Sequence, residues 1–346
     1  MSDTHRRIGS LLRPILAVLA AFAVSFALPS LTAAPAQAYL SIIRQGAESR
    51  GSRETGDLHG RSVATGDFNR DGFDDLAAGA PFEDVDGRSL AGAVVVNFGS
   101  PFGLKREGAQ LLLQSDGHTL QQGAQFGWAL AAGDFDDDGY DDLAIGAPGV
   151  DADPDHVNTG LVLVYAGGPG GLSYWHYLWQ PAGGGVPESN DAFGYALCAG
   201  NFDGLSGTNA DLAIGSPGED GDAGVVFWFT GSTQGLLNGS SGWFKQSTLG
   251  GTNVAGDRFG YSLAAGQMEG GLYEDLVVGA PFKEVDGVTD AGVVWRVVGS
   301  STGPNTATAR MIRPDEGDLP NAPYPEGWFG WSVAAGRFWG GNYDGL

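Results

Sequence analysis

The sequence has a single cysteine, Cys198, among 346 residues. One cysteine excludes an intramolecular disulfide, so a secreted chain of this kind needs another source of stability, and bound metal is one candidate. Basic residues are also scarce, because 18 Lys and Arg stand against 41 Asp and Glu, for a net charge of −23. This excess of negative charge argues against nucleic acid or an anionic membrane surface as a partner.

Long apolar runs are absent after residue 38, so we predict no membrane span in the mature chain. The first 38 residues have the pattern of a secretory signal peptide, with Arg6-Arg7, an apolar stretch over Ile15–Leu28 and the small residues Ala36-Gln37-Ala38. We therefore expect cleavage between Ala38 and Tyr39 and a secreted or cell-surface protein. The Arg6-Arg7 pair also allows twin-arginine export, and an uncleaved anchor is the alternative.

The common catalytic motifs are missing as well. The sequence has no Gly-x-Ser-x-Gly nucleophile elbow, and the glycine-rich stretch 167–171 lacks the Lys-Ser/Thr of a phosphate loop. The histidines beyond the signal segment lie apart in different contexts: His59, His118, His156 and His176. We predict that the chain is not an enzyme.

What the sequence does contain is glycine, at 59 residues, and an internal repeat. A segment built on Phe-Gly, with a variant form in its first copy, places equivalent glycines at Gly60, Gly127, Gly194, Gly260 and Gly330, with spacings of 67, 67, 66 and 70 residues. In the first four copies an acidic loop follows, then a strand ending in Gly-Ala-Pro or Gly-Ser-Pro, and then two further apolar segments. Four short strands in each repeat predict one blade of a β-propeller.

The opening segment of each repeat alternates large and small residues. In the second repeat Phe126, Trp128 and Leu130 are predicted on one face and the small residues between them on the other, so that each face packs against a different neighbouring blade. Cys198 falls in the small row of the third repeat, which predicts a buried small residue and not a nucleophile.

The acidic loops of the first two repeats, residues 67–75 and 134–142, carry the candidate site. Oxygen side chains at positions 1, 3, 5 and 9, with glycine at position 6, can converge on one hard cation, and position 7 can add its backbone carbonyl. An EF-hand is excluded because position 12 is Ala78 or Ile145 and the flanking segments are strands. A solvated acidic turn without metal is the alternative.

These loops, each set between a Phe-Gly strand and a Gly-Ala-Pro strand, resemble the calcium loops of integrin α-subunit propellers, and the repeats cover essentially the whole chain after residue 38. The resemblance implies an all-β protein, a β-propeller of four-stranded antiparallel blades, seven if complete and about four to five here. It also implies Ca²⁺ as the bound ion. The ligands would be Asp67, Asn69, Asp71, Phe73 and Asp75 in repeat 1, and Asp134, Asp136, Asp138, Tyr140 and Asp142 in repeat 2.

Later repeats depart from the loop pattern. Repeat 3 offers Asn201, Asp203 and Asp211 with two extra residues between them, and whether it binds metal stays open. Repeat 4 has Gln267, Glu269 and Asp275 but Gly271 at the fifth position, and repeat 5 starts with Arg337. We expect two cation sites, in repeats 1 and 2.

The resulting domain plan is a signal peptide over 1–38 and a propeller over 39–346, with repeats starting near 59, 126, 193, 259 and 329. We expect the last repeat to be truncated and the segment Leu40–Arg44 to supply its outer strand. The resemblance implies an extracellular protein-binding or cell-adhesion module whose ligand the sequence does not identify. The alternatives are an accessory propeller of a secreted hydrolase, since similar repeats occur beside a glycosylphosphatidylinositol-specific phospholipase D, and a lectin-like glycan binder.

Overall fold

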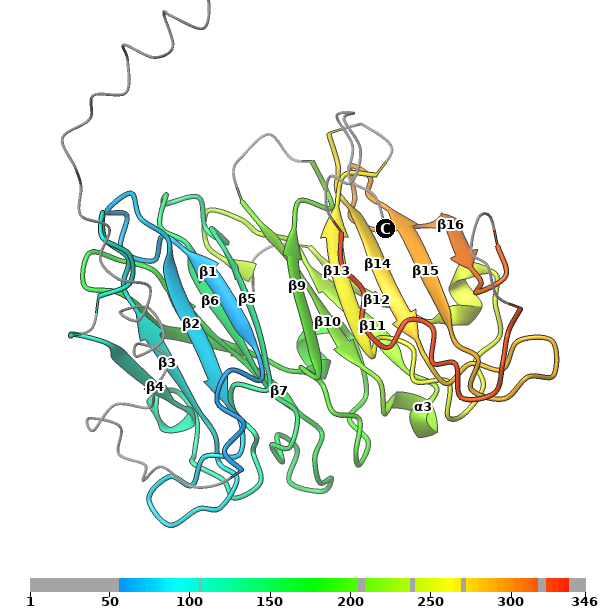
Figure 1. Ribbon diagram of the computed structural model, residues 1–346, viewed down its shortest axis with the longest axis horizontal. Coiled ribbons are helices and arrows are strands. Elements are labelled where there is room, and N and C mark those ends of the chain that lie inside the picture. The colour runs from blue at the N-terminus through cyan, green and yellow to red at the C-terminus, as the bar shows by residue number, and fades with distance from the viewer. Residues whose placement is uncertain are drawn as a thin grey trace, which may run out of the picture. The chain divides into compact units, whose positions relative to one another are not determined.

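The computed structural model describes residues 56–105, 107–204, 209–236, 240–268, 272–316 and 322–335 (Figure 1). The expected signal peptide, the segment Leu40–Arg44, the loop residues Glu269 and Gly271, and the last repeat from Gly336 onward, with Arg337, lie outside these ranges. Among the described residues, no helix has the length and apolar character needed to cross a membrane.

The described residues form four antiparallel sheets of four strands each, and in every sheet the strands pair in chain order. The first two sheets contain β1 (Val63–Gly66), β2 (Asp75–Ala80), β3 (Ala93–Asn97) and β4 (Gln110–Leu113), then β5 (Ala129–Gly133), β6 (Asp142–Ala147), β7 (Leu161–Ala166) and β8 (Ser173–Leu178). The next two contain β9 (Ala196–Gly200), β10 (Asp211–Ser216), β11 (Val225–Phe229) and β12 (Ser241–Phe244), then β13 (Ser262–Gly266), β14 (Asp275–Ala280), β15 (Val293–Val298) and β16 (Asn305–Ile312).

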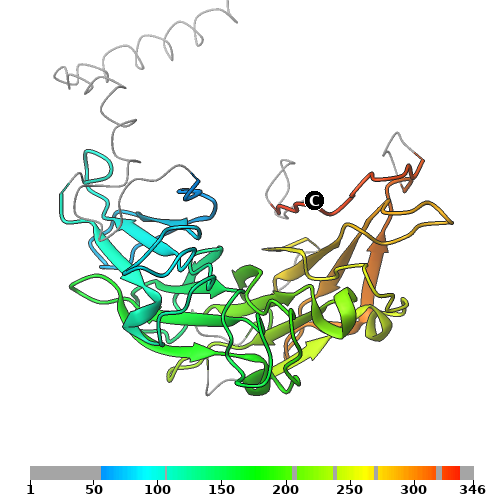
Figure 2. The same ribbon diagram turned by 90° about the horizontal axis from the view of Figure 1, so that it is seen from below.

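Among the described residues, the helical segments are short and lie at strand ends. They are the 3₁₀ helices η2 (Gln114–Asp116) and η4 (Gln246–Leu249) and the single-turn α-helices α2 (Gln180–Gly183) and α3 (Glu219–Asp222). The prediction of an all-β protein with four-stranded antiparallel blades is therefore confirmed. Figure 2 shows the four blades following one another in chain order, from blue and cyan through green to orange.

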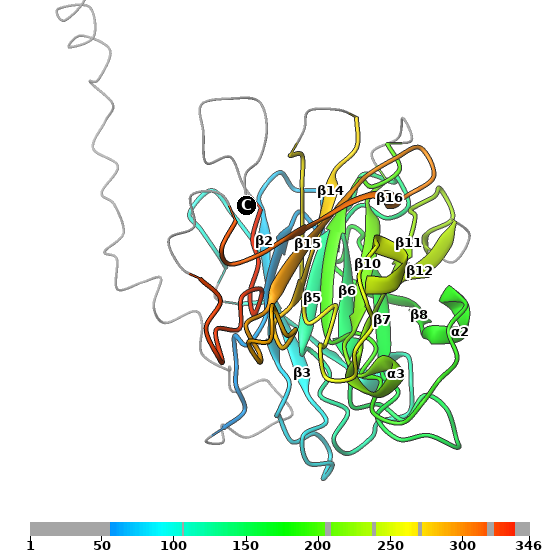
Figure 3. The ribbon, with the colours of Figure 1, turned by 90° about the vertical axis from the view of Figure 1, so that its right-hand side faces the viewer.

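The second strand of each blade is the most deeply buried, because it is flanked by strands in its own sheet and covered by a neighbouring blade. Every residue of β6, β10 and β14 is buried. Within β6, a Cβ atom built at Gly146 would lie 2.1 Å from the carbonyl oxygen of Gly194 in the next repeat. The glycine of the Gly-Ala-Pro motif is thus required by the close approach of the next blade. Figure 3 shows β6 and strands of the other blades from the side.

Apolar side chains fill the space between consecutive blades. One core joins the first and second blades, another the second and third, and another the third and fourth. Cys198 on β9 is only 8% exposed, as predicted, and burial raises the pKa of its thiol well above its ordinary value. A buried protonated thiol is a poor nucleophile, so Cys198 acts as a small core residue.

The predicted alternation of the opening strand is wrong at its start. The strand begins at Ala129, because Gly127 has a φ of 87° and the chain turns there. Phe126 is fully buried in the core between the first two blades, but Trp128 does not share its face. The ring of Trp128 lies instead 5.2 Å from that of Tyr195 in the next repeat. The left-handed turn breaks the two-residue period that the sequence pattern assumed.

Candidate metal centre

The acidic loops of repeats 1 and 2 each connect the first and second strands of a blade, β1 to β2 and β5 to β6. Both begin directly after the glycine that ends the first strand and close at an aspartate that starts the second. Because the two strands are hydrogen-bonded neighbours, the ends of each loop are held close together. The loops are therefore tight hairpin connections in which side chains two residues apart can point to one centre.

In the loop of repeat 2, three predicted ligands converge. One carboxylate oxygen each from Asp134, Asp136 and Asp138 lie within 4.8 Å of one another. Backbone donors hold them in place: the N–H of Asp138 donates to Oδ1 of Asp134 and of Asp136, both at 3.2 Å, and the N–H of Gly139 donates to Oδ2 of Asp134 at 2.9 Å. The N–H of Tyr140 donates to Asp138 Oδ1 at 2.9 Å. An all-oxygen donor set of this kind fits a hard cation such as Ca²⁺.

These carboxylates are in an unfavourable electrostatic setting without a counter-charge. Burial raises the pKa of Asp134 and of Asp136, and the negative charge of Asp138 raises both further. A raised carboxyl pKa means that the ionised form is less stable in the fold than in water. A bound cation would remove this penalty because it stabilises all three ionised groups at once.

Asp142, at position 9, stands apart from this cluster of three. It is 1% exposed, and its two oxygens accept hydrogen bonds from the N–H of Phe135 and of Gly167, both at 2.9 Å. Burial raises the pKa of Asp142 to about 7, and the charges of Asp136 and Asp134 add to this. Asp142 therefore links the loop to the connection between β7 and β8. Its role as a metal ligand stays a prediction.

The loop of repeat 1 has the same hydrogen-bond pattern with one carboxylate fewer. The N–H of Asp71 donates to Oδ1 of Asp67 and of Asn69, both at 3.0 Å, and the N–H of Phe73 donates to Asp71 Oδ1 at 3.1 Å. Asp75 is buried and accepts the N–H groups of Phe68 (3.1 Å) and Gly99 (2.7 Å), like Asp142. Its pKa is raised, chiefly by burial.

Lys105 brings a positive charge next to the first loop. Lys105 Nζ lies 3.3 Å from Asp71 Oδ2, with both side chains partly exposed. An ammonium group there competes with a metal ion for one of the predicted ligands, although an exposed ion pair is worth little in stability. With two carboxylates and an amide facing a lysine, the repeat 1 loop fits a cation less well than the repeat 2 loop.

Repeat 3 keeps only part of the arrangement. Asp211 accepts the N–H groups of Phe202 (2.6 Å), Asp203 (3.1 Å) and Gly231 (2.9 Å), and Asn201 Oδ1 accepts the N–H of Gly204 at 2.7 Å. Burial raises the pKa of Asp211 to about 7. The residues between 204 and 209 lie outside the described ranges, so the metal question for repeat 3 stays open.

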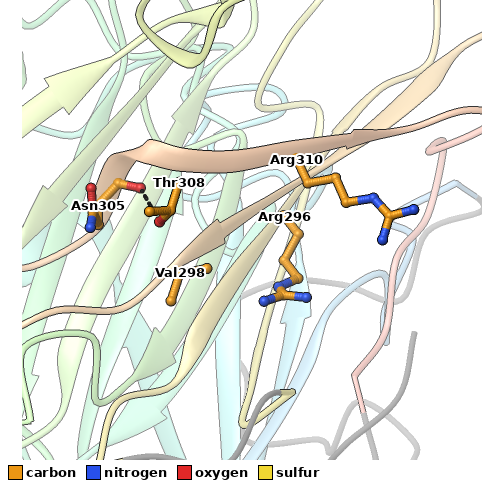
Figure 4. Close-up of a pocket in the computed structure, with 5 residues that line it drawn as sticks. All are labelled: Arg296, Val298, Asn305, Thr308 and Arg310. Atoms are coloured by element: carbon orange, nitrogen blue, oxygen red, sulfur yellow. Dashed lines mark hydrogen bonds between the residues drawn. The ribbon is translucent and has the colours of Figure 1, made fainter.

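In repeat 4 the buried aspartate at the end of the loop has a basic side chain as its partner. Arg296 Nε on β15 lies 3.2 Å from Asp275 Oδ2, and both side chains are largely buried. Arg296 occupies the register position that Val164 holds in the second blade. Figure 4 shows Arg296 in a pocket that is also lined by Val298, Asn305, Thr308 and Arg310. Arg310 forms a separate ion pair with Glu316. In repeat 4, whose loop lacks the metal-binding pattern, the guanidinium of Arg296 thus pairs with the aspartate that ends the loop.

Sequence reasoning did not single out Lys105, Arg296 or Arg70, whose guanidinium reaches the second loop. Arg296 had a detectable pattern, because it is a charged residue in a strand where the other repeats have apolar ones. Lys105 and Arg70 had none, since their partners lie 34 and 68 residues away in the chain.

A family model of the FG-GAP repeat matches residues 59–96 and 126–165, the two segments that contain the acidic loops just described. This chain contains FG-GAP repeats. Integrin alpha-PS2 of Drosophila melanogaster is 36% identical over 232 residues, which are 64% of this chain and 15% of that protein. Phosphatidylinositol-glycan-specific phospholipase D of Bos taurus is 34% identical over 165 residues, which are 46% of this chain and 18% of that protein.

The matched FG-GAP region is thus less than a fifth of either relative. Among solved structures, the rhamnogalacturonan lyase PL11 of Bacillus licheniformis aligns with a TM-score of 0.40 and 13% identity, over 73% of this chain and 48% of that chain. A likeness this low carries no argument about function. The resemblance of the FG-GAP repeats to those of integrin α-subunits is confirmed by the family model and by the identity to integrin alpha-PS2.

Proposed function

We propose that this FG-GAP repeat protein is an extracellular β-propeller module that is stabilised by Ca²⁺ and binds other proteins, without enzymatic activity of its own. The observation that carries the calcium part is the convergence of Asp134, Asp136 and Asp138 within 4.8 Å in a loop that fixes them with backbone hydrogen bonds. The signal-peptide pattern of residues 1–38 supports an extracellular place, where calcium is abundant.

In this proposal the ion is structural. It would be held by the carboxylates of Asp134, Asp136 and Asp138, with Tyr140 and Asp142 completing the predicted set, and it would neutralise their repulsion. Because the loop joins β5 to β6, an ion there stabilises the strand pair at the end where the chain enters the central strand. A site with a dissociation constant of about 0.1 mM would add about 1 to 2 kcal/mol of stability at about 1 mM calcium.

Protein binding is supported by a row of aromatic rings that crosses the blades. Trp128, Tyr195, Tyr261 and Trp331 follow one another with centroid separations of 5.2, 5.0 and 4.7 Å. Trp331 is 47% exposed at one end of the row, and the guanidinium of Arg61 lies 4.4 Å from the Trp128 ring at the other. Of these four rings only Trp331 is exposed, and exposed tryptophan side chains are typical of protein interfaces, where large rigid rings contribute most to affinity.

A second candidate follows from the phospholipase D relatives: the module would be an accessory domain of a hydrolase. A binding screen and an activity assay test the first candidate. The mature chain is screened against an array of secreted and cell-surface proteins in calcium and in chelator, with Trp331→Ala beside the wild type, and is also incubated with a glycosylphosphatidylinositol-anchored reporter. Calcium-dependent binding that Trp331→Ala weakens supports the proposal. Release of the reporter anchor, or binding that is equal for both proteins and in chelator, contradicts it.

A further inference from the structure

The two acidic loops of repeats 1 and 2 touch each other, although they belong to different blades. Arg70 stands at position 4 of the first loop, between the predicted ligands Asn69 and Asp71. Its Nη1 donates a hydrogen bond of 2.9 Å to the backbone carbonyl of Asp138, a predicted ligand residue of the second loop. The guanidinium also lies 5.7 Å from the centroid of the Tyr140 ring.

The fit of Arg70 against the second loop depends on glycine. A Cβ atom at Gly139 would lie 2.7 Å from Arg70 Cζ, so the guanidinium packs directly on the glycine backbone. Gly139 has a φ of 86°, which the turn between Asp138 and Tyr140 requires. Arg70 therefore contacts the second loop across three consecutive residues, two of which are predicted to bind the ion.

A second connection joins the start of the first loop to the end of the second. The N–H of Asp67 donates to Asp141 Oδ2 at 2.8 Å, and the N–H of Asp141 donates back to the carbonyl of Asp67 at 3.3 Å. Asp67 is the first predicted ligand of the first loop, and Asp141 lies between the predicted ligands Tyr140 and Asp142 of the second. The first loop is thus hydrogen-bonded to the second loop at two places, Asp67 and Arg70.

The next two junctions are built from other residues. At the junction of repeats 2 and 3, Ala210 replaces Asp141 and keeps only the backbone bond, its N–H donating to the carbonyl of Asp134 at 2.7 Å. Glu274 restores the two-way bond with Asn201 at the junction of repeats 3 and 4. The position of Arg70 is taken by Asp137 in repeat 2. An arginine at this loop position therefore occurs only in the first repeat.

We propose that the two loops are coupled cation sites, in which filling one site raises the affinity of the other through Arg70 and Asp141. The proposal rests on the proposed calcium binding. An ion in the first loop fixes Asn69 and Asp71, which flank Arg70, and so fixes the guanidinium on Asp138–Tyr140. The second ion then binds a loop that is already ordered, and by linkage the effect is reciprocal.

The coupling can be measured at the second site alone. Terbium(III) is a lanthanide that takes oxygen-lined calcium sites, and its luminescence is sensitised by a nearby tyrosine. Tyr140 provides that tyrosine in the second loop, whereas the first loop has Phe73 at the same position. Titration of the mature chain with terbium therefore reports the affinity of the second site, in the wild type and in Asp71→Asn, which weakens the first site.

We expect terbium to bind the second site about five-fold more weakly in Asp71→Asn than in the wild type, at the lower end of typical coupling between sites. Asp74→Asn, in the same loop and with the same charge change but at a position that is not a predicted ligand, should leave the affinity unchanged. In an Arg70→Ala background, or Arg70→Gln if Ala impairs folding, the ratio of the second-site affinities with and without Asp71→Asn should fall toward one. Arg88→Ala, an exposed arginine elsewhere, should keep it near five.

An equal affinity in wild type and Asp71→Asn would overturn the coupling while leaving calcium binding intact. A five-fold ratio that persists without Arg70 would show that the effect does not pass through this side chain, and would also overturn it. A ratio that 0.5 M KCl removes in the wild type would assign the effect to long-range charge and overturn the proposal, because salt screens charges that lie farther apart than the Debye length, about 10 Å at 0.1 M and shorter at 0.5 M. Absence of terbium and calcium binding in every variant would refute the proposed function itself.

Discussion

The carboxyl pair Asp191 and Glu219 in the third blade gives the sharpest prediction about stability. Asp191 is fully buried and Glu219 is 8% exposed. The side-chain amide of Gln180 donates to both, at 2.8 Å to Asp191 Oδ2 and 2.6 Å to Glu219 Oε2. Burial raises the pKa of Glu219 to about 9, and the charge of Asp191 adds to this. At neutral pH the pair therefore holds one proton.

In the fourth blade, the corresponding buried aspartate is paired with a lysine instead of a second acid. There Lys283 Nζ lies 2.7 Å from Asp257 Oδ2, and the amide of Gln246 donates to the same oxygen at 2.8 Å. Lys283 and Glu219 follow equivalent positions after the second strands of their blades, and both side chains are largely buried. Where one repeat has an ion pair, the other has two acids that must keep a proton.

The perturbation we choose is Glu219→Gln, which keeps the size of the side chain and removes its ionisation. The pKa of Glu219 is higher in the folded chain than its ordinary value of 4.5. Its contribution to stability is therefore complete below about pH 4.5 and is lost as pH rises toward 9. Keeping the proton at pH 7 costs up to about 3 kcal/mol, from 1.36 kcal/mol for each pH unit above the ordinary pKa.

The assay is the free energy of unfolding by denaturant between pH 5 and pH 9, at fixed calcium, for wild type, Glu219→Gln and the exposed control Glu284→Gln. We expect Glu219→Gln to match the wild type within about 1 kcal/mol at pH 5 and to exceed it by about 2 to 3 kcal/mol at pH 7. Glu219→Lys, which copies the fourth blade, should also be more stable than the wild type at pH 7. Parallel pH profiles for wild type and Glu219→Gln would refute the proton-sharing pair.

Two further predictions concern the packing of the blades and the acidic loop end of repeat 4. Gly146→Ala should destabilise the fold by about 2 kcal/mol or more, because the added methyl group would meet the carbonyl of Gly194 at 2.1 Å; the midpoint of denaturant unfolding measures this. Arg296→Met should cost about 3 kcal/mol, because it leaves the buried carboxylate of Asp275 without its guanidinium; thermal and denaturant unfolding at pH 7 measure the loss.

Each of these substitutions has a matched control in the chain. Gly170 has open space around its Cβ position and no positive φ, so Gly170→Ala should change stability by less than about 1 kcal/mol. Arg88 is exposed, so Arg88→Met should be nearly neutral. Equal effects of Gly146→Ala and Gly170→Ala would contradict the close approach of blades, and a neutral Arg296→Met would contradict the role given to that guanidinium.

Much of the fold could be predicted because the sequence of each repeat contains a recognisable pattern of strands. The run from Asp142 to Ala147 and its counterparts are apolar segments of strand length, and the four sheets form where these patterns place them. The turn at Gly127 could not be predicted, because glycine in an alternating run reads equally well as a small residue on one face. Its positive φ is a property of the folded backbone.

The residues of the candidate site could be predicted from the sequence, but their contacts in the fold could be predicted only in part. The spacing of Asp134, Asp136 and Asp138 indicated that their oxygens would meet, and they lie within 4.8 Å. The same spacing assigns Asp142 as a ligand, which stays a prediction; in the fold its oxygens accept backbone N–H groups of Phe135 and Gly167. The contribution of Gly167 comes from another strand connection, 25 residues away, and local spacing contains no information about it.

The most direct test of the central claim is the number of calcium ions that the mature chain binds, measured by isothermal titration calorimetry. We predict two ions for the wild type, one each for Asp138→Asn and Asp71→Asn, and none for the double variant. Asp137→Asn, which removes one charge from the same loop at a position that is not a predicted ligand, should still bind two. No calcium uptake by the wild type, or full uptake by the double variant, would contradict the account.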